Sequence, residues 1–111
     1  MIRTVPETGS TNADLLAALR AGEPVNEGDW LVADRQSAGR GRQGREWFDG
    51  AGNFMGSTVV VPSEGGPPPA SLSFVAALAV RDACAGALGE CGALALKWPN
   101  DVLLEGGKLS G

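Results

Sequence analysis

Three leucines near the start of the chain recur at the spacing of one helix face. Thr11 can accept a hydrogen bond at the start of such a helix, and Asp14 completes an acidic variant of the capping box. Gly22 followed by Pro24 is typical of a helix end. The pattern therefore predicts a helix that begins at Thr11 and carries Leu15, Leu16 and Leu19.

Two short apolar runs follow and are separated by a long polar segment. Residues 29–34 form an apolar run bounded by aspartates, and residues 54–61 are rich in β-branched side chains before Pro62. Both runs predict strands. The segment between them, 35–53, is rich in Gly and Arg and predicts a loop.

The second half of the chain predicts one helix and a hairpin. After the stiff connector 63–69 (SEGGPPP), apolar residues at helical spacing predict a long helix that ends near Gly89. The face expected to be buried consists of Leu72, Val75, Ala76, Ala79, Val80 and Ala83.

Two further strands are expected at 93–97 and 101–104, joined by a turn at 98–100. A tight hairpin turn at 105–108 follows, in which Gly106 and Gly107 tolerate positive φ. This order predicts an α+β fold with a mixed, mostly antiparallel sheet packed with helices. The hairpin's returning strand has only begun at 109–111, so we expect 1–111 to be the N-terminal portion of a larger domain.

The amino-acid composition limits which residues can carry out a reaction and which partners the chain can bind. The chain has 111 residues, a formal net charge of −4 and no histidine or tyrosine. The acidic balance argues against wholesale coating of nucleic acid or of an anionic membrane. Without histidine there is no Ser-His or Cys-His nucleophile pair, so carboxylates, lysine, arginine and backbone amides must carry any reaction.

The chain shows no export or membrane signal. The start lacks the basic head and apolar stretch of a signal peptide, and the apolar stretch 74–80 is too short to span a bilayer. Cys84 and Cys91 lie in an alanine-rich region and are expected to be reduced thiols. These features favour a cytoplasmic protein.

The sequence Gly39-Arg40-Gly41-Arg42-Gln43-Gly44-Arg45 is the clearest candidate binding segment. Alternating glycines let backbone amides approach a ligand, and guanidinium groups bind carboxylate or phosphate in bidentate fashion. The segment therefore suggests an anion cradle. A flexible solvated loop or an RGG-like nucleic-acid segment would account for it equally well by itself.

Four motifs together are more specific. The order Ser10-Thr11-Asn12, GRGRQGREW (39–47), KWPND (97–101) and GGKLSG (106–111) resembles the catalytic domain of biotin protein ligases, from Ser10 to the last residue. The resemblance implies the fold of that domain, which is similar to class II aminoacyl-tRNA synthetases. It also implies that the remaining sheet strands and a small C-terminal β domain lie outside this chain.

The implied activity joins biotin to ATP, giving biotinyl-5′-AMP and pyrophosphate. Biotin then passes to a lysine of the biotin carboxyl carrier protein of acetyl-CoA carboxylase. Biotin's own carboxylate is the nucleophile on the α-phosphate, so catalysis consists of positioning and charge neutralisation. A site without histidine suits this reaction.

The resemblance also implies a role for individual residues. Lys108 would bridge the biotin carboxylate and the α-phosphate, and Lys108, Asp101 and Arg42 form the implied catalytic group. The residues implied to contact biotin are Ser10, Thr11, Asn12, Gln36, Gly39, Arg40, Gly41, Arg42 and Lys108. The residues implied to contact the nucleotide are Arg42, Arg45, Trp47, Asn100, Asp101 and Lys108.

Several of these assignments have structural alternatives. Asp101 could hold Mg²⁺ or orient the acceptor lysine, but it could also only stabilise the turn after Pro99. Lys97 could add charge near the phosphates or be a solvated edge residue. Trp30 and Trp98 are expected in the core or at its border. Gln43 stands where the family's loop often has a basic residue, so altered retention of the adenylate is expected.

Other functions remain open at this point. A truncated, catalytically incompetent biotin-binding fragment and a lipoate-ligase-like acyl-adenylate enzyme are the alternatives, and a nucleic-acid-binding loop is opposed by the acidic charge. Because the chain begins almost at the first motif, we expect no winged-helix DNA-binding domain. The exposed hairpin edge could pair with another chain, so a homodimer is one possible arrangement.

Overall fold

The computed structural model describes residues 1–89 and 92–111, in two compact units, Met1–Val61 and Pro62–Gly111. The first unit contains β1 (Ile2–Thr8), α1 (Thr11–Arg20), β2 (Trp30–Gln36), the 3-10 turn η1 (Arg42–Gly44) and β3 (Met55–Thr58). The second contains the 3-10 turn η2 (Pro69–Ser71), α2 (Leu72–Leu88), β4 (Leu94–Lys97), β5 (Asp101–Leu104) and β6 (Gly107–Ser110). The α+β class is confirmed, and each unit has its own three-stranded sheet.

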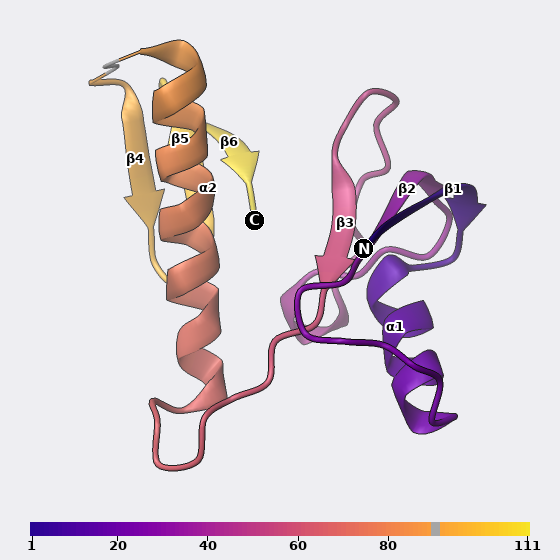
Figure 1. Ribbon diagram of the computed structural model, residues 1–111. Coiled ribbons are helices and arrows are strands. Elements are labelled where there is room, and N and C mark those ends of the chain that lie inside the picture. The colour runs from indigo at the N-terminus through magenta and orange to yellow at the C-terminus, as the bar shows by residue number, and fades with distance from the viewer. Residues whose placement is uncertain (90–91) are drawn as a thin grey trace. The chain divides into compact units, whose positions relative to one another are not determined.

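In the first unit β2 is the central strand, with β1 parallel to it and β3 antiparallel. Figure 1 shows this sheet together with α1. The sequence analysis missed β1. Its sequence, IRTVPET, does not alternate apolar and polar side chains and includes Pro6, and most of its residues are exposed, so no apolar pattern marks the strand.

One face of this sheet packs against α1. Leu31 and Ala33 alternate along β2 as its buried positions, and Met55 pairs with Ala33 from β3. Leu15 and Ala18 of α1 complete the core. Because Leu31 is only 1% exposed in the middle strand, this small core depends strongly on it.

The helix α1 begins at Thr11 as predicted, but its N-cap is not the expected residue. Ser10, not Thr11, is the N-cap, and its Oγ accepts a hydrogen bond from Ala13 N at 3.3 Å. The Asp14 side chain accepts a hydrogen bond from Thr8 instead of completing a capping box. The Thr11 hydroxyl is thereby released from capping and points into the unit.

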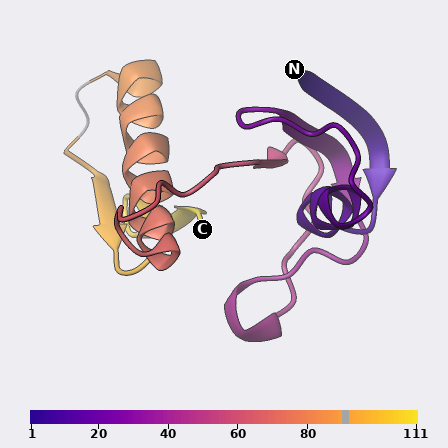
Figure 2. The same ribbon diagram turned by 60° about the horizontal axis from the view of Figure 1, so that its bottom comes forward.

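In the second unit α2 lies along an antiparallel sheet in the order β4-β5-β6, as Figures 1 and 2 both show. The buried Ala77 and the fully buried Val102 of β5 lie at its centre. The predicted face of α2 is largely wrong: the positions with reduced exposure are Ser73, Ala77, Val80, Cys84 and Ala85. Of the expected set only Val80 is among them, because the helix is apolar nearly all round and periodicity cannot select a side.

The hairpin turn is also shifted by one residue. Leu104 pairs with Gly107, so Glu105 and Gly106 are the two turn residues, with φ of 50° and 80°. A two-residue turn of this kind needs positive φ at both central positions. Glu105 therefore adopts the conformation expected for Gly107, which begins β6.

The segment Pro69–Leu88 is long and apolar enough to cross a membrane by length and composition alone. The prediction from the sequence considered only the uninterrupted apolar stretch 74–80, whereas the helical segment that meets this criterion is longer and includes Arg81 and Asp82. A core helix of a soluble protein passes the same test, so this single helix is weak evidence for a membrane span.

The tryptophans and cysteines follow the expectations only in part. Trp30 lies at the border of the first core and meets Phe54 edge-on, with ring centroids 6.1 Å apart. Trp98 is 76% exposed and contacts Phe74, so the expected core position is wrong for it. Cys84 is a half-buried free thiol, whereas Cys91 lies outside the described residues.

Candidate functional site

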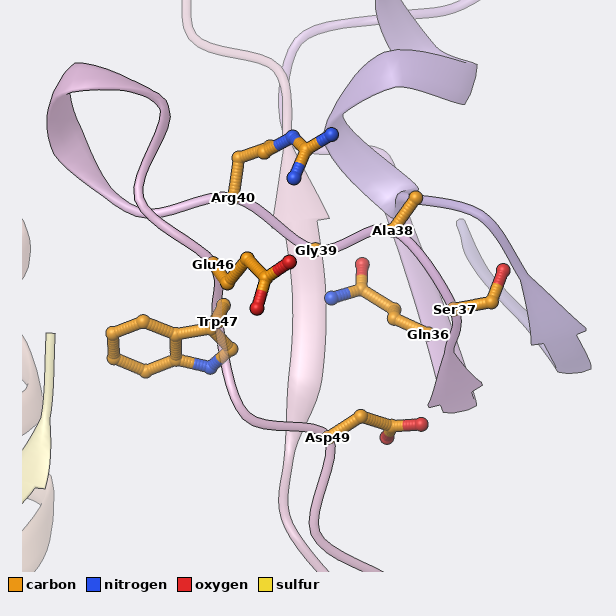
Figure 3. A pocket seen from close by; sticks show the side chains of 8 residues that line it. All are labelled: Gln36, Ser37, Ala38, Gly39, Arg40, Glu46, Trp47 and Asp49. Carbon is orange, nitrogen blue, oxygen red and sulfur yellow. The ribbon is translucent and has the colours of Figure 1, made fainter.

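The first unit contains a cavity of about 330 Å³ between the end of β2 and the glycine- and arginine-rich residues 39–49, which we call the Gly/Arg loop. Its volume falls at the lower end of the range typical of small-molecule sites. The lining residues, drawn in Figure 3, are Gln36, Ser37, Ala38, Gly39, Arg40, Glu46, Trp47 and Asp49. We refer to it below as the Gln36 cavity.

Backbone hydrogen bonds hold the Gly/Arg loop at its base. Trp47 N donates to Gly39 O at 3.2 Å, and Gly41 N donates to Arg45 O at 2.7 Å. Arg40 and Glu46 form a β-bridge between these two bonds. The loop is thus a narrow hairpin whose base forms part of the cavity wall, while its tip at η1 reaches away from the lining residues.

Gln36 is a cavity residue whose side chain is held by hydrogen bonds from another element. Its Oε1 accepts two hydrogen bonds from Thr11, one from the backbone N at 2.7 Å and one from Oγ1 at 3.0 Å. Thr11 is 2% exposed, and its Oγ1 also lies 2.8 Å from Ser57 Oγ of β3. The start of α1, the end of β2 and the middle of β3 are therefore joined by one polar network around the buried Thr11.

We expect Thr11→Val to lower the free energy of unfolding by about 1–3 kcal/mol. The change removes the hydroxyl that serves both Gln36 and Ser57, and a buried polar atom left unpaired costs about this much. Urea unfolding of the purified protein measures the difference. Thr11→Ser, which keeps the hydroxyl, should lose clearly less, and equal losses for the two variants would contradict the role of the network.

Asp49 closes the cavity at the end of the loop. Its Oδ2 accepts a hydrogen bond from Arg35 Nε at 2.8 Å, and this ion pair ties the loop back to β2. Asp49 Oδ1 is buried without a hydrogen-bond partner in the described part of the chain. The aspartate therefore has a structural role that no motif in the sequence indicated.

The second unit brings together two other residues implied by the resemblance. Lys108 Nζ of β6 lies 3.2 Å from Asp101 Oδ1 of β5. The backbone of Gly111 passes close to this pair, since a Cβ there would lie 2.8 Å from Asp101 Oδ1 and 2.9 Å from Lys108 Nζ. A glycine at 111 thus leaves room for the ammonium group beside the carboxylate.

The implied residues fall into three groups in the structure. Gln36, Gly39, Arg40 and Trp47 line the Gln36 cavity, and Thr11 is bonded to it through Gln36. Asp101 and Lys108 form the pair in the second unit. The others do not line the cavity: Ser10 caps α1, Gly41 is half-buried in the loop, Asn12, Arg42 and Arg45 are exposed, and Asn100 is half-buried in the turn before β5.

Ser57 is the clearest residue that the sequence analysis missed. It lies 46 residues from Thr11, and no motif includes it. Its position in the sequence still indicated that it points inward, because it follows the buried Met55 by two positions and so shares the inward face of β3. A serine at an inward strand position indicates a buried hydrogen-bond partner.

In the described residues no group of three or more Asp, Glu, Cys or His side chains is arranged to hold a metal ion. Asp101, the implied magnesium ligand, has Lys108 as its neighbour. One carboxylate is nevertheless sufficient for a magnesium ion that is bound mainly by substrate phosphates. The residue thus fits that limited role.

Known proteins match this chain along almost its whole length. It is 52% identical over 104 residues to a biotin–[acetyl-CoA-carboxylase] ligase of Paracoccus denitrificans, and 46% identical over 110 residues to one of Mycobacterium tuberculosis. These matches cover 94% and 96% of this chain but 42% and 41% of the relatives. The chain therefore spans about two fifths of the length of these relatives.

Solved structures agree with the sequence comparison. A biotin protein ligase from Aquifex aeolicus in complex with biotin and ATP is 34% identical, with a TM-score of 0.76 over 93% of this chain and 41% of that chain. One from Leishmania major in complex with biotinyl-5-AMP is 28% identical, with a TM-score of 0.74 over 96% of this chain and 48% of that chain. The model of the biotin/lipoate A/B protein ligase family matches residues 6–111. The chain belongs to the biotin/lipoate A/B protein ligase family.

Proposed function

We propose that the protein is an ATP-dependent biotin protein ligase. The observation that carries the proposal is the Gln36 cavity, in which the Gly/Arg loop and a hydrogen-bonded glutamine enclose a small-molecule site in a chain of this family. The names of the curated relatives support biotin as the substrate. Lipoate is the other substrate that the family description includes.

The Gln36 cavity is the proposed biotin site. It combines the apolar face of Trp47 with the polar groups of Gln36 and the backbone around Gly39, which suits a ring system that has an apolar body and polar ureido atoms. Arg40 adds positive charge to the same wall. The exposed guanidinium groups of Arg42 and Arg45 would meet the phosphates of the nucleotide and of the adenylate.

In the first step, an oxygen of the biotin carboxylate attacks the α-phosphorus of ATP. A P–O bond to biotin forms, the bond from the α-phosphorus to the bridging oxygen breaks, and pyrophosphate leaves. Both reactants are anionic, so a cation between them lowers the barrier by neutralising charge in the transition state. Lys108 is the proposed cation, and Asp101 holds its ammonium group at 3.2 Å.

In the second step, the amine of the acceptor lysine attacks the biotinyl carbonyl carbon. An amide forms, AMP leaves with the electrons of the C–O bond, and the amine loses a proton. The proposed acceptor is the biotin carboxyl carrier protein of acetyl-CoA carboxylase. Asn100 and Asp101 would lie beside the nucleotide, and Asp101 would supply one oxygen to a Mg²⁺ ion that shields the phosphates.

Pyrophosphate release by the full-length protein tests the proposal. We expect release that requires both biotin and ATP, and transfer of biotin to a purified carrier domain when that domain is added. Omission of biotin serves as the control for ATP hydrolysis. No release with biotin would overturn the proposal, and release with lipoate in its place would assign the protein to the lipoate branch.

A further inference from the structure

The end of the Gly/Arg loop and the turn that follows it, residues 48–53, are fastened to β2 at one point. In the described part of the chain, Asp49 is the only residue of this stretch that makes a hydrogen bond or ion pair with another element, through its contact with Arg35 Nε at 2.8 Å. The bond from Asn53 N to Gly50 O, at 3.1 Å, is internal to the turn. The Arg35–Asp49 pair therefore fixes this stretch to the sheet.

The two partners differ in their exposure to water. The Arg35 side chain is 55% exposed, whereas that of Asp49 is 18% exposed. Asp49 Oδ1 is buried without a hydrogen-bond partner among the described residues, so Arg35 provides the compensation for a largely buried carboxylate. Loss of the partner of a buried charge costs more than loss of an exposed pair, because the remaining charge is kept from water. The closed position of Asp49 therefore depends on Arg35.

Asp49 is also part of the cavity wall, two residues after Trp47. Trp47 lies against the backbone of the other side of the loop: a Cβ at Gly39 would be 3.5 Å from Trp47 Cβ, and one at Gly41 would be 3.7 Å from Trp47 Cε3. Figure 3 shows Trp47 and Asp49 along one segment beside the cavity. This segment is held at one end by the backbone bond to Gly39 and at the other by the ion pair with Arg35.

We propose that Arg35 and Asp49 form a latch that holds this side of the cavity closed before any ligand binds, and that opening of the latch limits ligand exchange. Both are positioning residues, because they act on the ligand through the loop. The identity of the ligand, biotin, rests on the proposed function, whereas the latch itself does not.

The latch has a kinetic consequence that an ordinary binding contact lacks. Because the ion pair forms without a ligand, it stabilises the closed loop equally in the free and in the bound protein. Its loss should therefore speed both the binding and the release of biotin and leave the Kd nearly unchanged.

Limited trypsin digestion of the full-length protein tests the latch without any ligand. The loop contains cleavage sites at the exposed Arg40, Arg42 and Arg45, and a narrow hairpin must open before a protease can cleave it. Arg35→Met keeps an unbranched stem but removes every donor. We expect it to raise the rate of cleavage in the loop about three- to tenfold, because more of the loop is open. Cleavage at Arg20 in α1, identified by mass spectrometry, should stay within about twofold.

An unchanged rate of cleavage in the loop would overturn the latch. An equal rise at Arg20 would overturn it as well, because that result indicates a general loss of stability in the first unit.

Asp49→Ala tests whether the two side chains act as a pair. It should raise the rate of loop cleavage less than Arg35→Met does, since no buried charge is left behind. The double variant of Arg35→Met and Asp49→Ala should resemble Asp49→Ala alone. Effects that multiply in the double variant would show that the two side chains act independently and would overturn the proposal.

Asp34→Ala is the matched control. It removes the same group from an exposed position on β2, next to Arg35 in the sequence, and should leave the rate of loop cleavage unchanged.

Stopped-flow binding of biotin, followed by tryptophan fluorescence, tests the effect on ligand exchange. In Arg35→Met we expect the association and dissociation rate constants to rise by the same factor, about three- to tenfold, with the Kd within about twofold of the wild type. A site that is merely weakened would instead show a raised Kd. A Kd raised tenfold, or rate constants equal to those of the wild type, would overturn the role of the latch in exchange.

The two measurements separate the latch from the proposed function. A wild-type protein that binds no biotin overturns the proposed function and the role in biotin exchange, while digestion without ligand still decides whether the latch exists. A wild-type protein that binds biotin, with loop cleavage unchanged by Arg35→Met, overturns the latch and leaves the ligase function in place.

Discussion

Replacement of Lys108 by alanine is expected to slow formation of the adenylate about 10²–10³-fold, the loss typical when one charge-stabilising group is removed from an active site. In the proposed reaction two anions, the biotin carboxylate and the α-phosphate, must approach each other. In that proposal the ammonium group of Lys108 on β6 would neutralise both anions, and the ion pair with Asp101 would hold it in place. Single-turnover pyrophosphate release, with saturating biotin and ATP, measures the chemical step.

Arg81→Ala is the matched control for this loss of charge. Arg81 lies on α2 in the same unit, is exposed and pairs with its neighbour Asp82 at 3.1 Å. Its replacement removes one positive charge and should leave the rate within about twofold, because the field of an exposed surface charge is largely screened by water and salt. A Lys108→Ala protein as active as Arg81→Ala would exclude Lys108 from the chemistry.

Replacement of Leu31 by alanine is expected to lower the free energy of unfolding by about 2–5 kcal/mol. Leu31 is 1% exposed in the central strand of the first sheet, where the helix α1 covers it. Few other apolar side chains are buried in this unit, so few neighbouring side chains can move to fill the cavity that the substitution leaves. Urea unfolding, followed by tryptophan fluorescence, measures the change.

Leu19→Ala provides the comparison, since Leu19 has the same side chain but is 43% exposed on α1. We expect a loss of less than about 1 kcal/mol there, because much of the side chain is already in water. Similar losses at the two positions would show that the first sheet does not have the core described above.

The candidate site was predictable to the extent that it consists of local motifs. The Gly/Arg loop, Gln36 beside it, and the Asp101 and Lys108 positions in a hairpin are each recognisable within a few residues. Ser57 was not, because its contact with Thr11 joins positions 46 residues apart. Such a contact arises from the pairing of β2 with β3 and leaves no local pattern.

The errors in the fold have a common physical origin. The strand β1 has no apolar alternation and forms by backbone hydrogen bonds to β2. The helix α2 has too many apolar residues for one face to stand out, so its packing against β4 and β5 selects the buried side. In both cases contacts with a neighbouring element, and not the local sequence, decide which residues form the strand or which side of the helix is buried.

By itself the amino-acid sequence determined most of the helices and strands after residue 10 and the resemblance to the family, because these depend on residue identity and short spacing. Only the tertiary structure decided that Ser10 caps α1 while Thr11 binds Gln36, and that the Gln36 amide is oriented by two other elements. The reason is that a hydrogen-bond network has a direction only when all its donors and acceptors are placed in space. A list of residues does not contain that direction.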